Sequence, residues 1–231
     1  EGLNRIQPPL GLMLSSSSMR NNGYEVKIHD CALEGWGHRV ALNNSMVMIG
    51  QSDEELASMI SDFSPSIVGI SALFSNLMES AHNIAAIAKK VNPKIIVVLG
   101  GNHISASIRD YRYSKFDKDP FFPPRLVDLE DVNIDFAMHG EVDFEFPRLV
   151  DILVNGGDVH SIKGLAYKNH NGGLESFYIS DAPSVIADMD SLPLPSRDLV
   201  NMEGYFKIGA FHSPKSRSKR VLSVMASERM P

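Results

Sequence analysis

The chain has 231 residues, 43% of them hydrophobic and 22% charged, which is typical of a globular protein with one full core and an appendage. Its formal net charge of −6 gives no electrostatic reason to expect nucleic acid or an anionic membrane as a partner. No stretch approaches the roughly 20 consecutive apolar residues that a membrane-spanning helix needs. Cys31 is the only cysteine, so these residues hold neither an internal disulfide nor a cysteine-based zinc or iron–sulfur site, and we expect a reducing, cytoplasmic setting.

The amino-terminal part predicts two helices with a short strand and a loop between them. Two prolines open a helix over residues 8–21, and an Asn-Gly pair ends it. Residues 24–28 (YEVKI) predict a short strand, and residues 31–51, which contain Gly35, Gly37 and the pair Asn43-Asn44, predict a loop. Ser52 then caps a helix that runs to Ser61, with a glutamate at the capping-box position.

The middle of the chain alternates apolar strands with amphipathic helices. The predicted strands are residues 66–71, 94–99 and 134–138, and the predicted helices are residues 76–91, 104–116 and 142–155. Apolar strands without alternation, separated by helices, indicate a parallel sheet covered on both faces. We therefore predict a doubly wound α/β fold of the flavodoxin-like kind. The usual first strand is missing from these residues, so we expect the protein to begin upstream of them.

The pattern changes after residue 160. Residues 164–168 and 174–179 flank an Asn/Gly-rich turn and predict a β-hairpin, and residues 181–200 read as a proline-containing linker. A basic stretch then precedes a short apolar strand at residues 221–226. We expect three parts: an α/β domain over residues 1–158, the hairpin and linker over 159–215, and the start of a truncated second domain over 216–231.

Ligands of open parallel sheets bind outside the carboxyl ends of the strands. Nine residues occupy that edge here: Ser71, Ala72, Leu73, Gly100, Gly101, Asn102, His103, Gly140 and Glu141. We expect their three segments to converge, because each follows a parallel strand. The glycine pair lets the backbone approach a ligand, although a tight turn into a helix explains it equally well. His103 and Glu141 also suit the first turn of a surface helix.

The spacing of these residues resembles the cobalamin-binding domain family. Ser71-x-Leu73 and Gly100-Gly101 match the family's second and third signature elements. The resemblance implies that the Ser71 hydroxyl meets the benzimidazole nitrogen of cobalamin and that the glycines leave room for its nucleotide tail. The first element, D-x-H-x-x-G, fits residues 30–35 (DCALEG) except that Ala32 replaces the cobalt-ligating histidine. We therefore expect bound cobalamin to have a lower face without a protein imidazole, and no metal ligand in the chain.

A wider set of motifs resembles the cobalamin-dependent radical S-adenosylmethionine subfamily. The motifs are residues 8–12 (PPLGL), 22–26 (NGYEV), 100–103 (GGNH), 139–141 (HGE) and 188–200 (DMDSLPLPSRDLV). That subfamily includes methyltransferases and anaerobic magnesium-protoporphyrin monomethyl ester cyclases. The resemblance implies cobalamin in this part of the protein. It also implies a [4Fe-4S] cluster and S-adenosylmethionine in a radical domain that would follow, the family's first cluster cysteine falling at Met230. The partners expected are thus cobalamin and the protein's own radical domain, and the chain alone is expected to be inactive.

Three alternatives use the same fold. A phospho-receiver domain needs an aspartate where Ser71 stands, and a dinucleotide-binding domain needs a G-x-G-x-x-G that no helix start provides. A fold-retaining interaction domain that no longer binds cofactor stays open. For the cobalamin reading, we expect bulk at Gly101 to abolish cofactor retention while leaving the fold largely intact.

Overall fold

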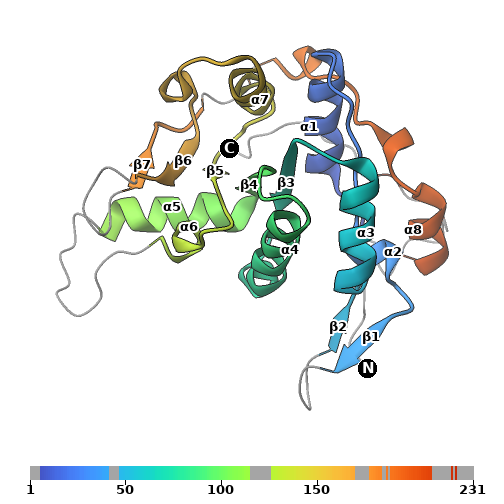
Figure 1. Cartoon of the computed structure of the whole chain (residues 1–231). Helices are drawn as coiled ribbons and strands as arrows, with labels where there is room; N and C mark the ends of the chain where they lie inside the picture. The colour runs from blue at the N-terminus through green and yellow to red at the C-terminus, as the bar shows by residue number, and fades with distance from the viewer. Residues whose placement is uncertain are drawn as a thin grey trace. The chain divides into compact units, whose positions relative to one another are not determined.

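The structure is a computed structural model that describes residues 6–41, 47–114, 126–169, 177–183, 186, 188–209, 220 and 222 (Figure 1). The chain forms two compact units. One contains Glu1–Ser52 and Ile186–Pro231, and the other contains Asp53–Val185. The predicted hairpin turn at 170–173, the terminal residues 227–231 and most of the predicted strand at 221–226 lie outside the described residues.

The unit Asp53–Val185 is built on a five-stranded sheet in the order β3-β4-β5-β6-β7. The strands are β3 Ile67–Ser71, β4 Ile96–Gly100, β5 Phe136–Met138, β6 Leu165–Lys168 and β7 Phe177–Ile179. The first three are parallel, and β6 and β7 continue the same sheet in antiparallel orientation. The predicted α/β fold is confirmed. The hairpin proves to be an extension of the sheet and not a separate layer.

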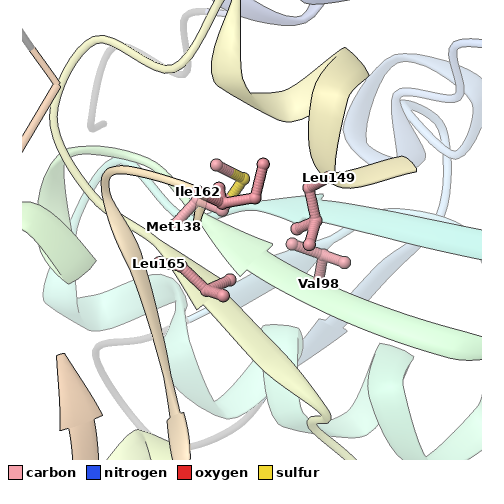
Figure 2. Packing of buried hydrophobic residues seen from close by; sticks show 5 residues of the cluster. All are labelled: Val98, Met138, Leu149, Ile162 and Leu165. Carbon is pink, nitrogen blue, oxygen red and sulfur yellow. The ribbon is translucent and has the colours of Figure 1, made fainter. Parts of the chain in front are cut away.

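Helices cover both faces of this sheet. The helices of this unit are α3 Asp53–Phe63, η1 Ser75–Leu77, α4 Met78–Val91, α5 Asn102–Ser114, α6 Val127–Glu130, α7 Glu145–Asn155 and η2 Val159–Ser161. Leu149 of α7 packs with Val98 and Met138 on one face (Figure 2). Since side chains alternate along a strand, Val97 and Leu99 point to the opposite face, where α4 and α5 lie. Both are fully buried, which is why β4 reads as an uninterrupted apolar run.

The other unit is mostly helical. It contains α1 Leu10–Asn21, α2 Cys31–Glu34, an antiparallel pair of β1 Arg39–Ala41 and β2 Val47–Ile49, η3 Met189–Ser191, η4 Arg197–Leu199 and α8 Met202–Ile208. Asp30 caps α2 by accepting hydrogen bonds from the backbone of Ala32 and Leu33. Its second oxygen accepts a hydrogen bond from the Tyr205 hydroxyl of α8. This carboxylate therefore links the segment after α1 to α8.

Two predictions for this unit are wrong. Residues 24–28 are not in a strand, because β propensity alone supplies no hydrogen-bonded neighbour. Residues 31–51, predicted as a loop, contain α2 and the β1–β2 pair. Within the described part of the chain, no helix is long and apolar enough to cross a bilayer.

Candidate functional site

The three predicted segments meet at the carboxyl edge of the parallel strands. Ser71 and Gly100 are register partners at the ends of β3 and β4. Beyond them, the Ala72 amide donates a hydrogen bond to the Gly100 carbonyl at 2.8 Å, and the His103 amide donates to the Ala72 carbonyl at 3.2 Å. The Gly140 amide, which follows β5, donates to Ser105 Oγ of α5 at 3.0 Å. The expected convergence is confirmed.

Ser71 and Gly100 present the same face of the sheet. A Cβ at Gly69 would lie 3.5 Å from the Phe146 ring of α7, so the α7 face is also the face of Ser71, two residues along the strand. Gly100 shares that face because it is the in-register partner of Ser71 in a parallel pair. The Ser71 side chain is exposed. A hydroxyl and an open backbone position thus lie side by side.

Gly100 and Gly101 differ in what a Cβ at each position would contact. A Cβ on Gly100 would meet only the Met138 carbonyl oxygen, at 3.8 Å, which is ordinary contact. Gly101 has φ +103°, and its Cβ would lie 2.4 Å from the Ala72 carbonyl oxygen. A side chain at Gly101 would therefore disrupt the turn between β4 and α5. The expectation that a larger residue at Gly101 leaves the fold largely intact is wrong. Gly100 is the position where space for a ligand is free.

The remaining predicted residues surround this pair. Ala72 is buried, whereas Leu73 beside it is 52% exposed and offers an apolar surface at the edge. Asn102, exposed, begins α5. Gly140 has φ +82°, a backbone angle that glycine adopts without strain, and Glu141 after it is half-buried.

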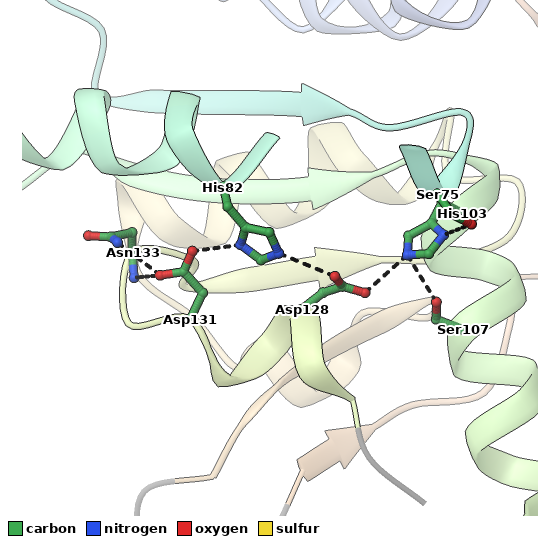
Figure 3. A network of polar contacts seen from close by, with 7 residues as sticks. All are labelled: Ser75, His82, His103, Ser107, Asp128, Asp131 and Asn133. Atoms are coloured by element: carbon green, nitrogen blue, oxygen red, sulfur yellow. Dashed lines mark hydrogen bonds and ion pairs between the residues drawn. The ribbon is translucent and has the colours of Figure 1, made fainter. Parts of the chain in front are cut away.

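The His103 ring contacts polar side chains other than Ser71. Its Nδ1 lies 2.9 Å from Ser75 Oγ, and its Nε2 lies 3.2 Å from Asp128 Oδ2 (Figure 3). Ser75, Asp128 and Ser107 line a hollow of about 310 Å³ with His103, Met78, Leu126 and Val127. Sequence reasoning did not find Ser75 or Asp128. Ser75 follows a predicted strand, and its position near the carboxyl end of that strand could have marked it as a candidate site residue. No sequence pattern indicated Asp128.

Two ionisable groups after β5 have shifted pKa values. Burial lowers the pKa of His139, and the nearby Arg112 lowers it further, so the ring is held neutral with its Nε2 donating to the Ser180 carbonyl at 3.2 Å. Burial, together with the charge of Glu141, raises the pKa of Asp143. Across the described residues, no group of three or more His, Cys, Asp or Glu side chains is arranged to hold a metal ion. The edge therefore has the groups to bind and orient a ligand through hydroxyl, backbone and apolar contacts.

These features define an open α/β ligand-binding domain with a serine and a glycine turn at its sheet edge. The family model that matches it is the B12 binding domain, over residues 3–118. The chain belongs to the B12-binding domain family.

Two curated relatives are methyltransferases. The chain is 28% identical over 238 aligned residues to cytidylyl-2-hydroxyethylphosphonate methyltransferase of Streptomyces wedmorensis, with 95% of this chain and 41% of the relative covered. It is 32% identical over 198 residues to an uncharacterized methyltransferase of Pyrococcus horikoshii, with 86% and 35% covered. The chain thus spans well under half the length of these relatives.

Solved structures of cobalamin-dependent radical enzymes share the fold. The enzyme OxsB with aqua-cobalamin and S-adenosylmethionine bound matches 88% of this chain and 23% of its own, with a TM-score of 0.60 and 14% identity. The methyltransferase TsrM of Kitasatospora setae, with cobalamin and a [4Fe-4S] cluster bound, matches 85% of this chain and 30% of its own, with a TM-score of 0.51 and 15% identity. At these identities the similarity establishes the B12-binding Rossmann-like fold.

Proposed function

We propose that this chain is the cobalamin-binding region of a radical S-adenosylmethionine enzyme and that the Ser71–Gly100 edge holds the nucleotide tail of the cofactor. The observation that carries the proposal is the pairing of an exposed hydroxyl with an open glycine on the same face of the sheet. A ligand there gains a hydrogen bond at one strand end and room at the next. This is the space a Cβ at Gly100 would fill, so the residues present fit the group.

Each edge residue has a separate role in this proposal. The Ser71 hydroxyl donates to the benzimidazole nitrogen, and the glycine turn admits the tail close to the backbone. Leu73, half exposed, gives the macrocycle an apolar contact. The other edge residues, which shape the rim, are Ala72, Asn102, His103, Gly140 and Glu141. When bound, cobalamin supplies a cobalt centre that carries a transferable group, and the chain's own task is to bind and orient it.

The names of the relatives support methyl transfer over oxidative ring closure as the activity of the whole protein. We propose that the [4Fe-4S] cluster and S-adenosylmethionine belong to a radical domain that follows these residues, and that the protein is cytoplasmic. The proposed boundaries are 1–158 for the cobalamin domain, 159–215 for the hairpin and linker, and 216–231 for the start of the radical barrel.

The test is cofactor retention. The chain is incubated with hydroxocobalamin, passed over a gel-filtration column and read by its visible absorption spectrum. We expect the colour to elute with the protein. We also expect Ser71→Ala to weaken binding about tenfold, the effect of one lost hydrogen bond in a covered site. Ser66→Ala is the matched control, because Ser66 is exposed just before the other end of the same strand.

Failure of the wild-type chain to retain colour would favour the other candidate, a fold-retaining interaction domain. Equal retention by Ser71→Ala and Ser66→Ala would refute the tail assignment while leaving cobalamin binding in place.

A further inference from the structure

A chain of polar side chains joins four elements on the face of the sheet that carries α4 and α5. It runs from Ser75 of η1 through His103 of α5 and Asp128 of α6 to His82 of α4, and it ends at Asp131 (Figure 3). The side chains of His103 and Asp128 are each only 16% exposed. Fully exposed ion pairs contribute little to stability because water screens them. The His103–Asp128 contact is largely shielded from water, so we expect it to contribute more.

Asp128 is the centre of this network. Its Oδ2 lies 3.2 Å from His103 Nε2, and its Oδ1 lies 3.3 Å from His82 Nε2. The other nitrogen of His82 lies 2.6 Å from Asp131 Oδ2. Both nitrogens of His82 therefore face carboxyl oxygens, from Asp128 and from Asp131. His103 differs, because its Nε2 faces the Asp128 carboxyl group whereas its Nδ1 faces the Ser75 hydroxyl, which can donate or accept.

The Asp131 carboxylate has a lowered pKa. Although partial burial raises the pKa of Asp131, hydrogen bonds from the backbone amide of Asn133 and from His82 lower it more, and the net shift is downward. The Asn133 side chain adds a further hydrogen bond to the same carboxylate, at 2.8 Å. The His82 ring thus lies between two carboxyl groups, those of Asp131 and Asp128.

His103 connects this network to the candidate ligand edge. Its ring reaches Ser75 in the loop after β3, while its own backbone amide, in the turn after β4, donates to the Ala72 carbonyl. One residue thus joins the segment that follows β3 and carries Ala72 and Leu73 to the turn that follows β4 at Gly101. Ring and amide act as two separate links between the same two segments.

We propose that Asp128 is a positioning residue for the ligand edge. It orients the His103 ring, and that ring holds the loop after β3 and the turn after β4 at the separation that the nucleotide tail of cobalamin requires. The inference rests on the proposed function above. Asp128 acts through His103, because its carboxyl oxygens contact the His103 and His82 rings.

The test compares variants of the whole 231-residue chain in hydroxocobalamin titrations followed by visible absorption. We expect Asp128→Ala to raise the dissociation constant about tenfold, since the ring loses a charged partner. Asp128→Asn should restore binding to within about threefold of wild type, because the amide oxygen still accepts from His103 Nε2. The matched control is Asp110→Ala, a 74% exposed aspartate of α5, which should bind as wild type.

A double-mutant cycle shows whether Asp128 acts through His103. Asp128→Ala combined with His103→Ala should bind no worse than His103→Ala alone, since residues acting as one unit are not additive. Fully additive losses, or wild-type affinity in Asp128→Ala, would overturn the proposal. If Asp128→Ala fails to fold, Ser75→Ala frees the opposite side of the ring and should weaken binding similarly.

Hydrogen exchange separates this inference from the proposed function. The Ala72 and His103 amides make the backbone bonds of the edge, and they should exchange about tenfold faster in Asp128→Ala than in Asp110→Ala, with or without cofactor. If the wild-type chain does not bind cobalamin, the proposed function falls and exchange alone decides the positioning role. Unchanged exchange at these amides would refute that role.

Discussion

The substitution Gly100→Val should weaken cobalamin binding at least about tenfold without weakening the fold. A Cβ at Gly100 meets nothing closer than the Met138 carbonyl oxygen at 3.8 Å, and a β-branched residue suits the end of strand β4. Replacing a strand glycine also removes conformational freedom from the unfolded chain, which favours folding by roughly 0.5–1 kcal/mol. The added methyl groups would project on the Ser71 face, into the space proposed for the nucleotide tail.

The neighbouring Gly101→Ala provides the contrast. Its backbone angle of +103° costs about 1–3 kcal/mol for a residue with a Cβ, and that Cβ would lie 2.4 Å from the Ala72 carbonyl oxygen. The carbonyl must then shift and weaken the hydrogen bond it accepts from His103, a further loss of about 1 kcal/mol. We expect a destabilisation of about 2 kcal/mol or more, which corresponds to a fall in melting temperature of about 4–8 °C.

The assay pairs thermal melting with hydroxocobalamin titration for both variants. We expect Gly100→Val to melt at or above the wild-type temperature and to bind hydroxocobalamin at least about tenfold more weakly. Gly101→Ala should melt below the wild-type temperature. Wild-type cofactor affinity in a stable Gly100→Val would show that the tail does not enter this space. Severe unfolding of Gly100→Val would show that the space around Gly100 does not accommodate a β-branched side chain.

Two further substitutions test the interior of each unit. Tyr205→Phe removes the donor to a partly buried carboxylate, Asp30, and should destabilise the chain by about 1–3 kcal/mol in urea unfolding; an unchanged midpoint would contradict the importance of this bond. His139 is held neutral by a lowered pKa, so the unfolded state binds more protons below the ordinary value of 6.5, and stability should fall as the pH drops below 6.5. His139→Gln should flatten that part of the stability–pH profile, and an identical slope in the variant would refute the assignment.

The central strands and their common edge could be predicted because their signals are local. Residues 96–99 (IVVL) are apolar on both faces, which is typical of a parallel strand covered on both sides, and a glycine pair follows at once. Parallel strands separated by helices then align their carboxyl ends, so Ser71 and Gly100 had to meet. The same local logic does not separate Gly100 from Gly101. Which glycine needs a positive φ depends on the Ala72 carbonyl, a neighbour that comes from another strand.

The polar network on the opposite face was not predictable for a related reason. Asp128, His82 and His103 come from three helices, and nothing in their spacing says that these helices bring two imidazoles to one carboxylate. The position of the β6–β7 hairpin also depends on tertiary contacts. Its turn chemistry predicts pairing between its own strands, whereas joining β5 depends on the core that Leu165 and Ile162 complete (Figure 2).

The single cysteine gives a prediction about the chemistry of the chain alone. Burial, followed by the charge of Asp30, raises the pKa of Cys31 to about 11, so the thiol is protonated at neutral pH. Iodoacetamide should therefore label the folded chain slowly and the urea-unfolded chain at an ordinary rate. A cubane cluster needs several thiolates, and a lone protonated thiol cannot hold one. Anaerobic reconstitution of this chain with iron and sulfide should consequently leave no stoichiometric iron and release no 5′-deoxyadenosine from S-adenosylmethionine. Cluster iron that survives gel filtration would show that other side chains of these 231 residues replace the missing cysteines.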